Sequence, residues 1–143
     1  MAPEHAVRIP AAALAAIVAH ARTERPRECC GLLVGIGDRV VEAVATANAA
    51  ADPLRGYEIP PIEHIRQMRR CRTLTADTGQ RHEVIGAYHS HPRSAPDPSA
   101  TDVAQAFKDF LYVIAGPADA DDVVTKAFRL TDEGMKTMKM EVC

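Results

Sequence analysis

The stretch AYHSHPRSAPDPSATD, residues 87–102, places two histidines one residue apart ahead of a proline-rich loop and an aspartate. The residues before it, with the histidines themselves, read as a β-strand over residues 83–91, and Pro92 would end that strand because proline has no N–H to donate. Alternate residues of a strand point to the same face, so His89 and His91 can direct both imidazoles toward one point. The stretch therefore predicts a histidine pair at the accessible tip of a strand.

The second half of this stretch predicts the start of a helix. Ser99 is a typical N-cap for a helix over residues 100–110, and Asp102 would then lie in its first turn, where the helix dipole favours a carboxylate. The sequence SATD also matches a capping box, which many helices use with no further role, and taken alone it favours that interpretation. Two imidazoles and one carboxylate, however, are a ligand set of catalytic zinc, which keeps a fourth position for water. The combination of both halves favours a metal site.

Other metal sites built on H-x-H fit these residues poorly. A cupin would need a glutamate shortly after the second histidine, where the chain reads RSAPDP. A metallo-β-lactamase-type site would need an aspartate where Arg93 stands. Amidohydrolase barrels are far longer than 143 residues, and the P-C-x-x-C segment of zinc nucleobase deaminases is absent from the sequence.

The composition is that of a folded protein with one domain, residues 1–143. Apolar residues make up 47% of the chain and charged residues 25%, which is enough apolar content for a core. Seventeen basic residues against 19 acidic ones, with no basic tract, argue against nucleic acid or an anionic membrane as a partner. The N-terminus does not resemble a signal sequence and no apolar run reaches membrane-spanning length, so we expect a cytoplasmic protein.

The four cysteines indicate reduced, structural thiols. Cys29 and Cys30 are neighbours in an apolar run, and Cys71 falls in a predicted helix, so all three are expected to be buried. No C-x-x-C pair exists, which excludes a zinc knuckle.

The rest of the chain predicts helices and strands that alternate irregularly through short connections. Further helices are expected over residues 10–25 and 61–72, with a turn-rich break over residues 75–82. Further strands are expected over residues 28–35, 39–48, 110–116, 122–130 and 135–142. This order favours a mixed α+β sandwich over a doubly wound parallel fold.

The motif His89-Ser90-His91-Pro92, followed by Ser99-x-x-Asp102, resembles that of the JAMM, or MPN+, metalloproteases. That family also has a glutamate far upstream, ahead of a glycine-rich apolar strand, and here Glu28 precedes CCGLLVG. Without the downstream motif, Glu28 would be interpreted as a solvated carboxylate at a strand edge. The resemblance extends from about Val7 to about Leu130. It implies an MPN/JAMM (cytidine-deaminase-like) α+β fold, with a mixed, mostly antiparallel sheet flanked by helices.

The same resemblance implies a role for each residue of the motif. His89, His91 and Asp102 would bind Zn²⁺, and Glu28 would act as general base and then as general acid. Ser99 would donate a hydrogen bond to the tetrahedral oxyanion. That role is compatible with capping the helix, because a hydroxyl both donates and accepts.

The resemblance further implies hydrolysis after the C-terminal glycine of a ubiquitin-like protein. Only short connections follow Asp102, which leaves little room for the second ubiquitin-gripping insertion of the deubiquitinating members. We therefore expect a small prokaryotic member that trims, or releases an amino acid from, a ubiquitin-like sulfur carrier with a di-glycine tail. A deubiquitinase-like isopeptidase remains open, as does a monomer or a homodimer. A non-catalytic MPN scaffold is the alternative from another class, although all five motif positions are filled. The segment RGYEI, residues 55–59, is either a strand-like edge for a substrate tail or a packed loop.

Overall fold

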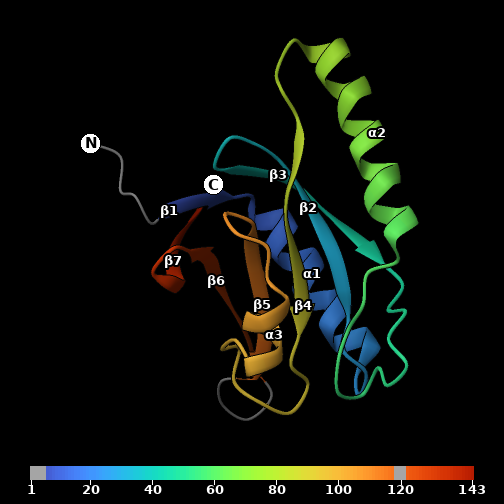
Figure 1. Ribbon diagram of the computed structural model, residues 1–143, viewed down its shortest axis with the longest axis vertical. Helices are drawn as coiled ribbons and strands as arrows, with labels where there is room; N and C mark the ends of the chain where they lie inside the picture. The colour runs from blue at the N-terminus through green and yellow to red at the C-terminus, as the bar shows by residue number, and fades with distance from the viewer. Residues whose placement is uncertain (1–5, 118–121) are drawn as a thin grey trace.

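The computed structural model describes residues 6–117 and 122–143, which form a single sheet with three helices (Figure 1). In chain order the elements are β1 (Ala6–Ile9), α1 (Ala11–Glu24), β2 (Cys30–Ile36), β3 (Arg39–Thr46), α2 (Pro61–Thr78), β4 (Glu83–Ser90), α3 (Ala100–Gln105), β5 (Leu111–Pro117), β6 (Val123–Thr131) and β7 (Gly134–Val142). Within the described residues, no helix combines the length and the apolar character needed to cross a bilayer.

The strands form a closed barrel in the order β1-β3-β2-β4-β5-β6-β7. Neighbouring strands are antiparallel except for β4 with β5 and for β1, which runs parallel to both β3 and β7. The predicted α+β class with a mixed, mostly antiparallel sheet is therefore confirmed. Sequence patterns missed β1, because four residues are too few to establish a period. It is this short strand that closes the sheet.

Because side chains alternate between the two faces along the central strands, apolar side chains form a separate layer on each face of the sheet. Leu33, Tyr88 and Val113 face the layer that receives the buried side of α1. Their chain neighbours Leu32, Ala87 and Tyr112 form a smaller cluster on the other face of the sheet. By the same alternation, a side chain two residues after Ala87 lies on the face away from α1. His89, two residues after Ala87, is therefore expected on that face.

Backbones approach closely in the middle of the sheet, where two glycines allow it. A Cβ built on Gly86 of β4 would lie 2.1 Å from the carbonyl oxygen of Leu111, and one on Gly31 would lie 2.4 Å from that of Val44. Real Cβ atoms do not come this near to a backbone oxygen. These glycines therefore set how closely β2 and β4 can pair with their neighbours.

Two of the predicted helix ends were wrong. The predicted break over residues 75–82 begins too early, because α2 continues to Thr78 and ends at Gly79, whose φ of 73° suits a left-handed C-cap. The helix predicted over residues 100–110 stops at Gln105. There the chain turns away, and the N–H of Phe107 donates to the hydroxyl of Tyr112 at 2.7 Å. This tertiary hydrogen bond takes the place of the hydrogen bond that the next helical turn would make, and no local sequence pattern predicts it.

The cysteines follow the prediction. Cys29, Cys30 and Cys71 are free and buried, whereas Cys143 is free and exposed. Burial raises the pKa of the Cys29 thiol to about 11, so this group stays protonated at neutral pH.

Candidate active site

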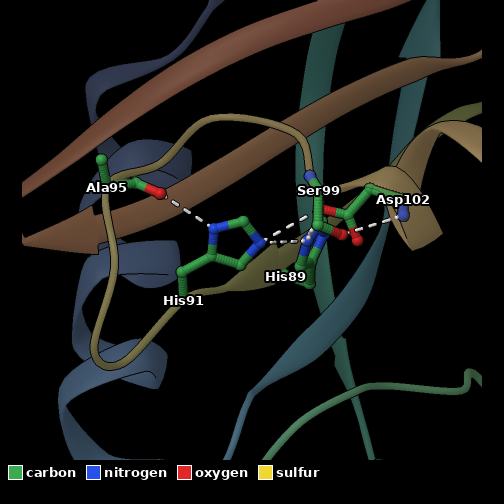
Figure 2. A network of polar contacts seen from close by, with 5 residues as sticks. All are labelled: His89, His91, Ala95, Ser99 and Asp102. Atoms are coloured by element: carbon green, nitrogen blue, oxygen red, sulfur yellow. Dashed lines mark hydrogen bonds and ion pairs between the residues drawn. The ribbon is translucent and has the colours of Figure 1, made fainter.

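The end of β4 and the first turn of α3 bring the two histidines and Asp102 together (Figure 2). His89 Nε2 lies 3.2 Å from Asp102 Oδ2, and His91 Nε2 lies 3.1 Å from the same oxygen. The two Nε2 atoms are 3.1 Å apart. Three donor atoms, from residues spread over thirteen positions of the chain, thus converge on one point, as the spacing of the motif predicted.

The ring of His91 is held in one orientation by the loop that follows β4. Its Nδ1 lies 2.9 Å from the carbonyl oxygen of Ala95, as Figure 2 shows. A carbonyl can only accept, so Nδ1 carries a proton. Burial would lower the pKa of His91, but hydrogen bonds to the Asp102 carboxylate and the Ala95 carbonyl raise it. A metal ion at Nε2 would take the place of the proton that Asp102 accepts there. Burial lowers the pKa of His89, which is 1% exposed, and so favours a neutral ring at that position. Neutral imidazole is the form that binds a metal ion.

Asp102 and Ser99 form a reciprocal capping box at the start of α3. The backbone N–H of Ser99 donates to Asp102 Oδ2 at 2.9 Å, and the N–H of Asp102 donates to Ser99 Oγ at 3.0 Å. Burial alone would raise the pKa of Asp102, but hydrogen bonds from both imidazoles and from the Ser99 N–H hold it far below its usual value. The carboxylate is therefore ionised, and one of its oxygens serves the cap and the histidine pair together. Because Ser99 Oγ accepts in the cap, its own proton remains available to donate.

The donor set fits a zinc ion. Tetrahedral zinc with bonds of about 2.0–2.1 Å to nitrogen and oxygen separates its ligand atoms by roughly 3.3 Å. The three separations of 3.1–3.2 Å between these atoms are close to that value. Among the described residues, these three form the one group of histidine, cysteine and acidic side chains close enough to hold a metal.

Glu28 reaches the same cavity from the residues just before β2. Its backbone N–H donates to the carbonyl of Pro53 at 2.8 Å, and the residue is only 8% exposed. A cavity of about 370 Å³ has Glu28, His91, Ser99 and Asp102 in its wall. Burial raises the pKa of the Glu28 carboxyl from 4.5 to about 7, partly opposed by the charge of His91. A carboxyl that titrates near neutral pH is suited to take up a proton and to give it back.

The structure thus gathers every residue that the sequence proposed for the site. His89, His91 and Asp102 are in mutual contact, and Glu28 and Ser99 line the cavity beside them. Their roles as ligands, base and oxyanion donor stay predictions. A larger cavity of about 660 Å³ lies between α2 and the start of β4, and none of these five residues lines it.

Sequence patterns missed two residues next to this site. Tyr57, from the segment over residues 55–59, stacks on the ring of His89 with centroids 4.2 Å apart and planes inclined by 17°. Asn48, just after β3, binds the backbone on both sides of Tyr57 through its amide group. The predicted role of this segment as a strand-like edge for a substrate tail stays a prediction. No spacing rule links an aromatic residue on a loop to a histidine 32 positions later, so only tertiary structure could show this pair.

Comparison with known proteins agrees with the fold and the motif. The family model described as prokaryotic homologs of the JAB domain matches residues 10–131. The chain is 36% identical over 108 residues to a desampylase of Haloferax volcanii, covering 71% of this chain and 73% of the relative. It is 32% identical over 120 residues to a CysO-cysteine peptidase of Mycobacterium tuberculosis, covering 82% and 77%. The structure of a JAB1/MPN domain protein from Archaeoglobus fulgidus, 20% identical, matches with a TM-score of 0.58 over 96% of this chain and 98% of that one. This last likeness confirms the predicted fold.

Proposed function

Since the chain belongs to the JAMM/MPN family, among the prokaryotic homologs of the JAB domain, we propose that it is a zinc-dependent peptidase acting on a ubiquitin-like protein. It hydrolyses the bond after the C-terminal Gly-Gly of that protein. The observation that carries the proposal is the convergence of His89, His91 and Asp102 in contact with one another, with Glu28 in the wall of the adjoining cavity.

Each of these side chains has a definite task in amide hydrolysis. A zinc ion held by His89, His91 and Asp102 would polarise the scissile carbonyl and lower the pKa of a water molecule from about 15.7 toward 7. Glu28 takes a proton from the attacking water and returns it to the leaving amine, which its pKa of about 7 allows at neutral pH. The Ser99 hydroxyl donates a hydrogen bond to the oxyanion that forms at the former carbonyl oxygen.

We propose a small sulfur carrier with a di-glycine tail as the substrate. Two features support this class over a large ubiquitin conjugate. The relative named CysO-cysteine peptidase aligns over most of both chains. In addition, α3 and β5 follow each other with only residues 106–110 between them, so no long insertion follows the motif here. The enzyme either trims the carrier or releases one amino acid from it.

The test uses two substrates that share the same sulfur carrier and differ in what is joined to its last glycine. One is a purified sulfur-carrier protein with a single residue after its Gly-Gly, and the other carries a lysine peptide joined to the same glycine through its side chain. With zinc present, the first should lose the mass of one residue, and neither Glu28→Gln nor His89→Ala enzyme should produce this change. An unchanged mass of the first substrate, with one zinc bound per chain, contradicts the sulfur-carrier proposal.

The isopeptide substrate tests the second candidate function. The likeness to a protein named desampylase favours keeping it. Faster cleavage of the lysine-linked substrate would identify an isopeptidase rather than a trimming enzyme. A non-catalytic scaffold predicts no cleavage of either substrate, and purified protein without metal after growth in zinc-replete medium would favour it.

The setting of this activity is also a proposal. Three buried free thiols suit a reducing compartment, so we place the protein in the cytoplasm. Its substrate is a protein rather than nucleic acid or a membrane, in keeping with the net charge of -2.

A further inference from the structure

The two imidazoles of the site are held in place by different means. His91 is oriented by the hydrogen bond from its Nδ1 to the Ala95 carbonyl. His89 Nδ1 is buried and makes no hydrogen bond to any described residue. A histidine that binds a metal usually fixes its ring by donating the other N–H to an oxygen. For His89, another contact has to supply that orientation.

Tyr57 makes such a contact. Its ring lies almost parallel to the imidazole of His89, with the centroids 4.2 Å apart and the planes inclined by 17°. A stack of this kind restricts rotation of the imidazole about its side-chain bonds. Tyr57 also lines both the cavity that contains Glu28 and a neighbouring apolar cavity of about 390 Å³. Tyr57 is therefore shared by the polar site and its apolar neighbour.

Asn48 holds the backbone that carries Tyr57. Its Oδ1 accepts from the N–H of Glu58 at 3.0 Å and from the N–H of Ala50 at 2.9 Å. Its Nδ2 donates to the carbonyl of Gly56 at 3.0 Å and to the carbonyl of Glu28 at 3.0 Å. One amide group thus ties both neighbours of Tyr57 to Glu28, which lines the cavity from just before β2. All four of its hydrogen-bonding positions are used.

We propose that Tyr57, held by Asn48, is the positioning residue for His89. The stack replaces the missing hydrogen bond at Nδ1 and keeps Nε2 directed at the point that His91 and Asp102 share. Asn48 acts on metal binding through Tyr57, and on proton transfer through the backbone of Glu28. The inference rests on the proposed function only in that the site binds a metal.

The test measures metal affinity, which requires no substrate. Zn²⁺ dissociation constants are obtained by competition with a chromogenic chelator for wild type, Tyr57→Ala, Tyr57→Phe and Leu54→Ala. Loss of an outer contact to a ligand histidine weakens metal binding by about 10- to 100-fold, and we expect this for Tyr57→Ala. Tyr57→Phe keeps the ring and should bind as wild type does. Leu54 is exposed on the same loop, and its variant controls for general loosening of that segment.

A spectroscopic readout distinguishes positioning from simple stability. The visible absorption bands of the Co²⁺-loaded protein report the coordination geometry. They should be the same in wild type and Tyr57→Phe but altered in Tyr57→Ala. Should Tyr57→Ala fail to fold, Tyr57→Leu takes its place with the same expectation, because leucine fills volume but offers no flat face.

The route through Asn48 is tested by a double-mutant cycle. If Asn48 acts on the metal site through Tyr57, then Asn48→Ala with Tyr57→Ala should bind zinc no more weakly than Tyr57→Ala alone. Additive losses would overturn that route. A zinc affinity of Tyr57→Ala within about threefold of wild type, with an unchanged Co²⁺ spectrum, would overturn the whole inference. Failure of the wild-type protein to bind one metal per chain would instead refute the proposed function.

Discussion

Replacing Glu28 by glutamine should make the metal-free protein more stable at alkaline pH while abolishing its activity. Folding raises the pKa of this carboxyl from 4.5 to about 7, chiefly through burial. The folded chain therefore keeps the Glu28 proton over a range in which the unfolded chain has lost it. Stability from this group falls as the pH rises from about 4.5 to about 7, and it stays low above that range. Glutamine has no proton to lose and escapes this penalty.

The magnitude follows from the two pKa values. At about 1.4 kcal/mol for each pH unit between them, the ionised carboxylate costs the folded state at most about 3 kcal/mol above neutral pH. At pH 5 the same calculation leaves a cost of roughly 1 kcal/mol. The advantage of Glu28→Gln over wild type should therefore grow by about 2 kcal/mol between about pH 5 and about pH 8. The other titratable groups are present in both proteins and largely cancel in the difference, apart from His91, whose charge interacts with that of Glu28.

The assay is urea unfolding of chelator-treated protein at several pH values, with the free energy of unfolding extrapolated to water. Glu141→Gln, at an exposed position on β7, is the matched control and should show no pH-dependent advantage. A Glu28→Gln advantage that stays constant within about 0.5 kcal/mol from pH 5 to pH 8 would refute the reasoning, because the carboxyl would then titrate as a solvated one. With zinc restored, the variant should bind one metal per chain and turn over no substrate. Turnover near the wild-type rate would remove Glu28 from its role as base.

The other predictions concern the cap, the thiols, the sheet and the metal. Ser99→Ala should lower the free energy of unfolding by about 1 kcal/mol because the helix cap is lost. It should also lower kcat by about 100-fold or more because the oxyanion donor is lost. Urea unfolding measures the first effect and steady-state kinetics the second, and an unchanged kcat would leave Ser99 as a cap alone. A thiol reagent such as dithionitrobenzoate should react with one thiol, that of Cys143, in the native protein and with four after unfolding. Fast reaction of a second thiol in the native protein would contradict the burial of the other three cysteines. Gly86→Ala should cost about 3 kcal/mol or more in unfolding free energy because its Cβ would meet the backbone oxygen of Leu111, whereas Gly56→Ala, with open space around it, should fold normally. Zinc at about 100 times its dissociation constant should stabilise the fold by about 2.7 kcal/mol, seen as a higher Tm that a chelator reverses; a Tm insensitive to both would count against a metal site in the native state.

Sequence patterns were most reliable where the chemistry depends on local spacing. The strand period places His89 and His91 on one face, and the helix cap places Asp102 beside Ser99. Both relations join residues at most three positions apart and are fixed by local backbone geometry. The same applies to Pro61, which opens α2 as predicted.

Predictions were less reliable where packing overrides a local pattern. The helix that follows Ser99 ends at Gln105 because Phe107 bonds to the hydroxyl of Tyr112. The strand β1 is too short to be recognised alone and exists through its pairing with β3 and β7. In both cases the deciding contact comes from another part of the chain.

The sequence by itself determined which donor atoms this protein can bring to a metal, because the two histidines lie within one pleat of a strand and Asp102 lies within one helical turn of its cap Ser99. Only the tertiary structure decided what surrounds them. Pairing of β2 with β4 brings the residues before β2 alongside the histidines, with Cys30 opposite His89, and so carries Glu28 to the cavity. Tyr57 reaches His89 because Asn48 folds its loop back onto Glu28. These contacts join segments tens of residues apart, and they depend on strand pairing and loop packing rather than on any spacing along the chain.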